Sequence, residues 1–322
     1  MTSIPHHKLN WSLVPPGMAQ AKPRAKGKFF EILKRAAGAW ASDNCMKLAA
    51  ALACYAVLSL APLVVITFKI VSVLFQSEKA RPLIEKQVQN LMGSAGSPEL
   101  IDSILNSSKH GDGLAATIIS VAVLLFGASG VFGELQNSMN IIWGVTLKPN
   151  AGIMGWIRAR FLSMTMVLGL GFLLLISLFV SAAITAVSHA MLGNAQVLGL
   201  LLDTALSLIY VTLLLAMIYK WLPDVKMSWK YVWEGAFFTA LLFVIGKFAL
   251  GLYFQYGAPA SAYGAFGSLA AVIIWVYYSA QILFFGAEYT KVHAQVKGHP
   301  LMPSVHAVAT ARNPMAPKAA TK

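Results

Sequence analysis

Three charged side chains interrupt long apolar stretches of this sequence: Lys69, Asp203 and Lys247. A lone charge in hydrocarbon costs about 2.5–3.5 kcal/mol on insertion scales unless it is paired or hydrated. At ~1.5 Å of rise per residue, all three lie in the same half of an apolar helical bundle, so Asp203 can meet Lys247 or Lys69. They form either an ion pair that locks helix packing or a site for an anionic or protonatable solute. Lys69 is the closest to a helix end and can instead extend outward.

Further polar side chains fall on single helical faces of these charged spans or of the last span, at roughly 100° per residue. Four helices with one polar or small-residue stripe each predict a common polar interior, and interhelical hydrogen bonding alone also produces such stripes. The polar residues that we assign to this path, with three more described below, are Tyr55, Ser59, Ser207, Tyr210, Tyr278, Gln281 and Glu288.

The stretch 127–140 combines a glycine ridge with a polar run. Glycines at 127, 130 and 133 are spaced three apart and permit close contact with another helix. The residues that follow include Glu134, Asn137 and Asn140, which are too polar for lipid. They indicate either a helix that continues into the cytoplasm or the inner mouth of a solute cavity.

Composition identifies the elements that must position these residues. The chain has 322 residues, of which 57% are hydrophobic and 11% charged, and its mean hydropathy is +0.67. About a quarter of the residues of a soluble domain are charged, so this composition excludes a soluble enzyme, a disordered protein and a disulfide scaffold. Apolar runs of about 20 residues are long enough to cross a bilayer as helices. We expect an all-α polytopic membrane protein with six spans at about 48–75, 114–133, 161–187, 197–220, 232–256 and 266–288.

Charge distribution predicts the orientation. Nineteen Lys and Arg residues fall in the segments on one side of these spans and four in the loops on the other. The positive-inside rule therefore places both termini in the cytoplasm. We also expect a flexible basic tail over 1–27, an interfacial helix from 28 to 40 at the start of a membrane domain over 28–292, a small helical cap over 76–113 on the periplasmic face, and a disordered basic tail over 293–322. Cys45 and Cys54 are expected to be free thiols.

Enzymatic motifs are missing from the sequence. The seven His residues have no metal-ligand spacing, and there is no P-loop or Gly-x-Ser-x-Gly elbow. The net charge of +13 is spread over several segments and forms no single basic patch. We therefore expect no enzyme, no metal, no cofactor and no nucleic-acid partner.

Several ordered motifs resemble the YihY/BrkB family of bacterial inner-membrane proteins. They lie at 49–63, 127–145, 222–226, 246–247 and 263–288, and the resemblance extends over about 30–292. Cys54 departs from the aromatic residue that members often have at that position. The resemblance implies a six-span protein of the inner (plasma) membrane, formerly mislabelled ribonuclease BN, with associations to virulence and suggestions of transport. It supplies no agreed catalytic or substrate residues.

Two functions follow as hypotheses. The first is a transporter or exporter of an unidentified small solute, with Lys247 and Asp203 as the charged centre of a polar path. The second is a non-transporting membrane scaffold or cell-envelope factor whose charges only lock the helices. The expected partners are the lipid bilayer and, for the first hypothesis, the solute. The sequence leaves open whether the chain forms a homo-oligomer.

Overall fold

The computed structural model describes residues 28–59, 82, 85, 102, 114–148, 196–256, 267–299, 301–305 and 307–310. Over 114–126 and 196–204 only the helical backbone is described. This part of the chain is mostly helical. Its helices are α1 (Lys28–Ser42), a helix over Cys45–Ser59, α5 (Leu114–Trp143), α7 (Gln196–Trp221), α8 (Trp229–Tyr256) and α10 (Gly267–Val296).

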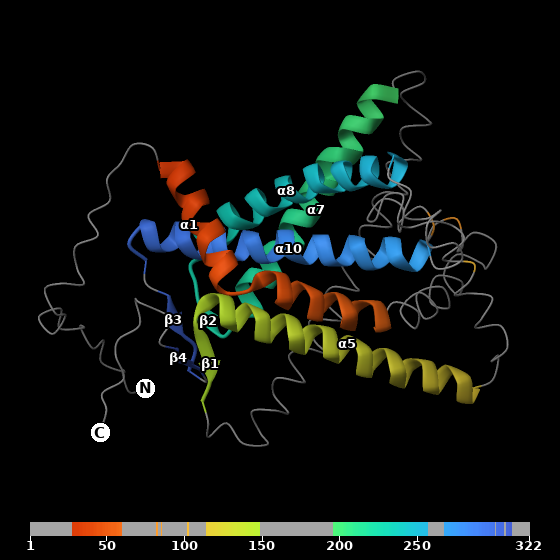
Figure 1. Ribbon diagram of the computed structural model, residues 1–322, viewed down its shortest axis with the longest axis horizontal. Coiled ribbons are helices and arrows are strands. Elements are labelled where there is room, and N and C mark those ends of the chain that lie inside the picture. Colours follow the sequence, from red (N-terminus) through yellow and green to blue (C-terminus); the bar gives the residue numbers. More distant parts are fainter. Residues whose placement is uncertain are drawn as a thin grey trace, which may run out of the picture.

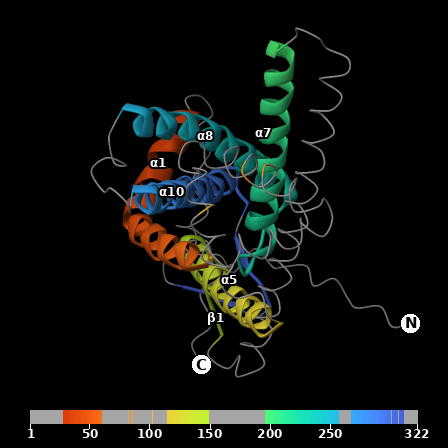
Figure 2. The ribbon, with the colours of Figure 1, turned by 90° about the vertical axis from the view of Figure 1, so that its right-hand side faces the viewer.

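Helix α10 runs through the middle of the bundle (Figure 1). Helix α8 packs against both α7 and α10, and α1 crosses α10 on another side (Figure 2). The crossing buries Ile32 and Ala36 of α1 against Tyr289 and Val292 of α10. The helix expected at the membrane surface is therefore present, but α10 covers part of its apolar face, while Phe29 stays exposed.

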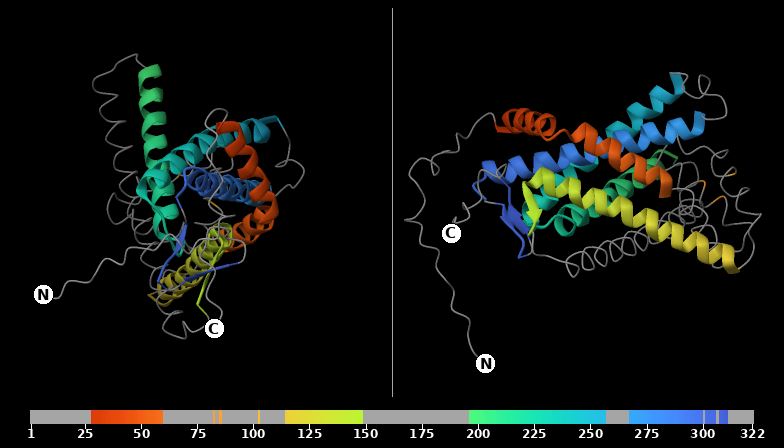
Figure 3. Two further views of the ribbon diagram at one scale, coloured as in Figure 1. Left: turned by 90° about the vertical axis from the view of Figure 1, so that its left-hand side faces the viewer. Right: turned by 60° about the horizontal axis from the view of Figure 1, so that its bottom comes forward.

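Two short antiparallel strand pairs lie at one end of the bundle, which we call the strand-bearing end (Figure 3). β1 (Val145–Leu147) follows α5 and pairs with β4 (Ala307–Ala309), and β2 (Val225–Lys226), between α7 and α8, pairs with β3 (Met302–Pro303). The prediction of a disordered tail from 293 onward is wrong for the described residues 293–299, 301–305 and 307–310. Residues 293–296 complete α10, and strand pairing holds the following segment across two interhelical loops.

Three left-handed backbone positions redirect the chain at the strand-bearing end. Asn44 (φ 53°) separates α1 from the Cys45–Ser59 helix, and asparagine is one of the few residues that tolerate this conformation. Gly144 (φ 66°) follows α5 and Gly298 (φ 79°) follows α10, as glycines that end helices commonly do. The turn at Asn44 places the flanking residues Asp43 and Cys45 in the buried interior.

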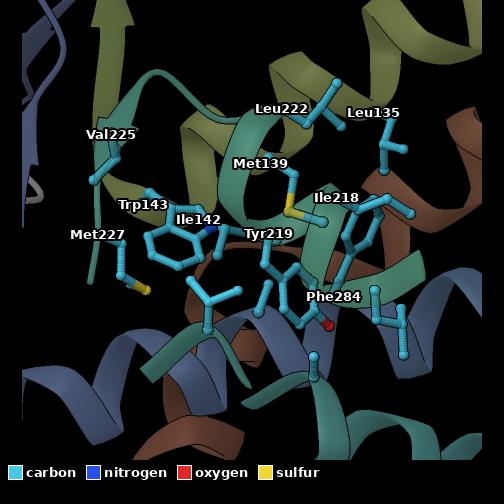
Figure 4. Packing of buried hydrophobic residues seen from close by; sticks show 14 of the residues in the cluster. Leu135, Met139, Ile142, Trp143, Ile218, Tyr219, Leu222, Val225, Met227 and Phe284 are labelled. Atoms are coloured by element: carbon cyan, nitrogen blue, oxygen red, sulfur yellow. The ribbon is translucent and has the colours of Figure 1, made fainter. Parts of the chain in front are cut away.

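The main apolar cluster fills the strand-bearing end. Figure 4 shows Ile142 and Trp143 of α5 beside Tyr219 of α7 and Phe284 of α10, and these side chains are almost completely buried. Because large side chains from three helices meet here, this end holds the helices together by close packing.

Among the described residues, two helical stretches are long and apolar enough to cross a membrane: Trp229–Phe254 and Leu269–Val296. Only 22% and 28% of the most apolar part of these two stretches is buried inside the protein, whereas the core helix of a soluble protein is mostly buried. Cys45–Ser59 and Ser207–Trp221 are shorter apolar helices. The expected span 161–187 and most of the expected cap at 76–113 lie outside the described residues. One face of α8 carries an exposed apolar stripe made of Phe237, Leu241, Ile245, Phe248 and Leu252.

Candidate functional site

Charged side chains from separate parts of the chain meet inside the strand-bearing end. Nζ of Lys291 on α10 lies 2.8 Å from Oε2 of Glu288 and 3.5 Å from Oδ2 of Asp43. It also donates a 2.6 Å hydrogen bond to the carbonyl oxygen of Ile142. The side chain of Glu288 is fully buried, and those of Asp43 and Lys291 are 9% and 15% exposed. One ammonium group in this Lys291 cluster (Lys291, Glu288 and Asp43) thus connects α10, the turn after α1 and the end of α5.

Local structure explains how each group reaches the Lys291 cluster. Glu288 and Lys291 are three residues apart on α10, a spacing that makes side chains neighbours on a helix. Ile142 lies in the last turn of α5, where backbone carbonyls have no partner within the helix. Asp43 directly precedes the left-handed Asn44. The ammonium group therefore satisfies a helix end while it joins the three segments.

The Lys291 cluster carries two acidic groups and one basic group. The charges of this cluster act on Cys45, a buried free thiol that precedes the expected first span. The pKa of Cys45 is raised to about 12. Burial is the largest cause, and the charges of Glu288 and then Asp43 also raise it. The charge of Lys291 lowers the pKa of Cys45 and is the smallest of these contributions. The thiol therefore stays protonated near neutral pH.

A second polar group, the Asp224 cluster (Asp224, Asn140 and Gln136), joins α5 to the loop between α7 and α8. Oδ2 of Asp224 accepts hydrogen bonds from Nδ2 of Asn140 (3.0 Å) and Nε2 of Gln136 (3.3 Å). The backbone N–H of Asp224 donates to Oδ1 of Asn140 (2.9 Å), and its carbonyl accepts from the backbone N–H of Ser304 (2.8 Å). Asp224 therefore ties α5, the loop and the C-terminal segment together.

A third contact holds α7, α8 and α10 at close range. Tyr219 is almost completely buried, and its hydroxyl donates to the carbonyl of Leu283 (2.7 Å) and lies 3.1 Å from the hydroxyl of Thr239. Gly286 of α10 faces this pair, and a Cβ there would collide with the Thr239 side chain and the Tyr219 hydroxyl. The close approach of the helices at this point therefore requires a glycine.

The polar face predicted for the first span serves helix packing where it is described. The Tyr55 ring and the Ser59 Cβ lie 3.0 Å from the positions that Cβ atoms on Gly130 and Gly127 would take. The Ser59 hydroxyl donates to carbonyls of its own helix, at Tyr55 and Ala56 (3.0 Å each). Gly127 and Gly130 thus have the predicted close-packing role, here between the Cys45–Ser59 helix and α5.

The polar run after the glycines continues as one helix to Trp143. Its three predicted site residues have different surroundings. Glu134 is half-buried and its Oε1 lies 3.5 Å from the hydroxyl of Ser138, Asn137 is exposed, and Asn140 is buried in the Asp224 cluster. Asn140 therefore has a structural role in this arrangement.

The predicted charge centre is described only in part. Lys247 is half-buried on α8, and the neighbouring Gly246 makes room for the ring of Tyr278 from α10. For Asp203 only the helical backbone is described, and Lys69 lies outside the described residues. The pairing of these three charges stays a prediction.

Three more residues of the predicted path are half-buried: Ser207 and Tyr210 on α7 and Gln281 on α10. The Tyr210 hydroxyl is enclosed and has no hydrogen-bond partner among the described residues. Glu288, the last of the predicted set, lies in the Lys291 cluster. The structure thus brings Glu288 together with residues that were not predicted.

A family profile described as virulence factor BrkB matches residues 36–306, well over half of the chain. The chain belongs to the BrkB family. It is 26% identical over 295 residues to a UPF0761 membrane protein of Alcanivorax borkumensis, covering 90% of this chain and 66% of the relative. A UPF0761 membrane protein of Pseudomonas paraeruginosa is 29% identical over 258 residues (76% and 58%), and one of Tolumonas auensis 30% over 262 residues (77% and 80%). The chain thus spans less than two thirds of the length of the first two relatives. No solved structure matches it.

Membership confirms the resemblance to the BrkB family and makes the chain a membrane protein. Sequence reasoning missed three charged residues of its polar clusters: Asp43, Lys291 and Asp224. Each flanks an apolar stretch, where a charge is usual and draws no attention. Two signals pointed to them: the three-residue spacing of Glu288 and Lys291, and the position of Asp224 within one of the motifs that carried the resemblance.

Proposed function

We propose that this BrkB-family membrane protein transports or exports a small polar solute, and that it spans the bacterial inner membrane six times with cytoplasmic termini. The Lys291 cluster carries this proposal. Charged groups inside a membrane bundle are costly, and they commonly mark solute or ion pathways. The excess of Lys and Arg in the segments of the strand-bearing end supports a cytoplasmic location for that end.

Several contacts support a state that is closed at the cytoplasmic end. The Lys291 cluster, the Asp224 cluster and the Tyr219 contact draw the helices together there. The strands of the C-terminal segment lie across two interhelical loops. Helices α5 and α7 diverge toward the opposite end (Figure 1). A transporter that alternates between two open sides would pass through such a state.

A specific observation favours a second candidate function, a non-transporting scaffold or envelope-associated factor. Tyr55, Ser59 and Asn140 were predicted for the polar path, and all three make helix-packing contacts instead. If the Lys291 cluster had only this role, its charges would lock helices and guide no solute. We propose no catalytic activity for either candidate.

Water access inside the bundle distinguishes the two candidates. In a Cys45→Ala, Cys54→Ser background, Ser207→Cys and Gln281→Cys variants in membrane vesicles are exposed to a membrane-impermeant maleimide from each side. Transport predicts labelling of both from at least one side. An Ile245→Cys control, at a residue that is 64% exposed on the apolar stripe of α8, should stay unlabelled because lipid covers it. If neither test position is labelled in folded protein, the scaffold is favoured and transport is refuted.

A further inference from the structure

Three exposed tryptophans lie together where α7 ends and α8 begins. Trp221 is the last residue of α7, Trp229 is the first residue of α8, and Trp233 lies about one turn further along α8. The ring centroids are 5.7 Å apart for Trp221 and Trp229, which meet edge to face, and 6.4 Å apart for Trp229 and Trp233. With the neighbouring Lys220 and Lys230, these residues form a surface that we call the Trp229 patch.

The ammonium group of Lys220 is held at the Trp229 patch by two contacts. It lies 5.4 Å from the centre of the Trp229 ring, and it donates a hydrogen bond to the carbonyl oxygen of Met227. The ring attracts it because the face of an indole is negative. An ammonium group has three N–H donors, so further donors remain for a ligand. The patch therefore has a fixed positive charge beside its exposed rings.

Two further lysines add positive charge at the start of α8. The first turn of α8 contains Lys230 and no acidic residue, although the N–H groups at a helix start favour negative charge. Lys226 of β2 is exposed between Val225 and Met227, which pack in the main apolar cluster (Figure 4). Neither Lys226 nor Lys230 has an ion pair among the described residues. A bound anion would offset the unfavourable charge of Lys230 at the helix start.

The acidic side chains next to the Trp229 patch have other partners. Glu234 follows Trp233, and its Oε2 lies 2.8 Å from Nε2 of His293 on α10. Asp224 accepts hydrogen bonds from two amides in the Asp224 cluster. These two carboxylates are outnumbered by the three lysines, so this surface has a net positive charge.

The Trp229 patch lies at a boundary of the membrane. The apolar stretch Ser207–Trp221 ends there and the stretch Trp229–Phe254 begins there, and tryptophan is enriched where the hydrocarbon core meets the headgroup layer. From Trp233 the exposed apolar stripe of α8 continues at four-residue spacing through Phe237 and Leu241. At ~1.5 Å of rise per residue, Leu241 lies about 12 Å from Trp233 along the helix, within the depth of one lipid leaflet. The surface thus offers positive charge at the headgroup level and apolar contact below it.

We propose that the Trp229 patch is a binding site for an anionic phospholipid. The phosphate group binds at Lys220, Lys230 and the start of α8, and an acyl chain lies along the apolar stripe of α8. Basic pockets at the ends of membrane helices recognise anionic headgroups by charge. A zwitterionic lipid brings its own positive charge and gains less from the lysines. The site rests on the membrane location of the chain and does not depend on transport.

Native mass spectrometry of the full 322-residue chain with added lipid tests this site. The probes are phosphatidylglycerol and phosphatidylcholine with identical acyl chains, and the apparent dissociation constants are compared. We expect tighter binding of phosphatidylglycerol. Lys230→Gln should weaken it about fivefold, and Lys220→Met added to this variant should weaken it by a similar factor. The control Lys34→Gln removes an exposed lysine of α1 and should leave the preference unchanged.

Equal affinity for the two lipids would overturn the proposal, because the tryptophans would then be membrane anchors without selectivity. A preference for phosphatidylglycerol that survives the double substitution would also overturn it. Equimolar inorganic phosphate should not displace the lipid, since it has no acyl chain, and displacement would refute a lipid as the ligand. Circular dichroism checks the folding of each variant. If the Lys220 variant unfolds, Lys230→Gln alone decides the test, because it replaces an exposed side chain.

Discussion

Replacing Lys291 by methionine removes the ammonium group that joins α10, the turn at Asp43 and α5. The variant removes the ammonium group from the Glu288 and Asp43 carboxyl groups and the hydrogen-bond donor from the Ile142 carbonyl. Removing one partner of a buried ion pair typically costs about 3–5 kcal/mol. The carboxyl groups can take up protons in response, so we expect the free energy of unfolding to fall by about 3 kcal/mol, the lower end of that range.

A double substitution separates the charge effect from the loss of a side chain. Glu288→Leu combined with Lys291→Met removes the ion pair, and apolar replacement of a buried pair is often neutral or stabilising. We expect the double variant to be more stable than Lys291→Met alone. Lys34→Met, on the exposed side of α1, is the matched control and should change stability by less than about 0.5 kcal/mol.

The assay is equilibrium unfolding of the purified protein in mixed micelles, followed by circular dichroism at several pH values. The loss in Lys291→Met should shrink as the pH falls, because protonation neutralises the two carboxylates. A loss below about 1 kcal/mol, the range of an exposed ion pair, would refute the buried bridge. So would a double variant that is less stable than the single one.

Three further predictions concern individual residues. Asn140→Ala should lower the free energy of unfolding by about 1–3 kcal/mol because it removes two of the hydrogen bonds that hold the half-buried Asp224, whereas the exposed Asn137→Ala should change it by less than about 0.5 kcal/mol; equal losses in unfolding assays would contradict the Asp224 cluster. Gly286→Ala should cost about 1–3 kcal/mol, because its Cβ forces α8 and α10 apart; a variant as stable as the unmodified protein in a thermal unfolding assay would argue against this contact. The Cys45 thiol should resist a membrane-permeant maleimide until the pH approaches its raised pKa of about 12, since only the thiolate reacts; modification of Cys45 in the folded protein near neutral pH, detected by mass spectrometry, would refute the assigned burial.

Helix positions were largely predictable from the sequence. Predicted spans at 197–220 and 232–256 correspond to α7 (Gln196–Trp221) and α8 (Trp229–Tyr256). In a bilayer every backbone polar group must be satisfied within the segment, so an apolar run of sufficient length has to be helical. The predicted span 266–288 corresponds to α10 (Gly267–Val296), which extends beyond the span to the residues on which α1 packs, Tyr289 and Val292. That extension depends on a contact between distant segments, which hydropathy does not report.

The roles of the polar residues were less predictable. Asn137 and Asn140 are the same residue type three positions apart, and only Asn140 meets Asp224, 84 residues away. Lys291 meets Ile142 across 149 residues. The strands of the C-terminal segment likewise exist because they find partners in two interhelical loops.

The sequence by itself determined that this chain is helical, apolar enough for a membrane and a member of one family, because these properties depend on local composition and on ordered motifs. The tertiary structure decided which polar groups are buried together, because the free energy of a buried charge depends on the partner that folding brings to it. Asp43, Glu288 and Lys291 form a cluster only because the turn after α1 is packed against α10.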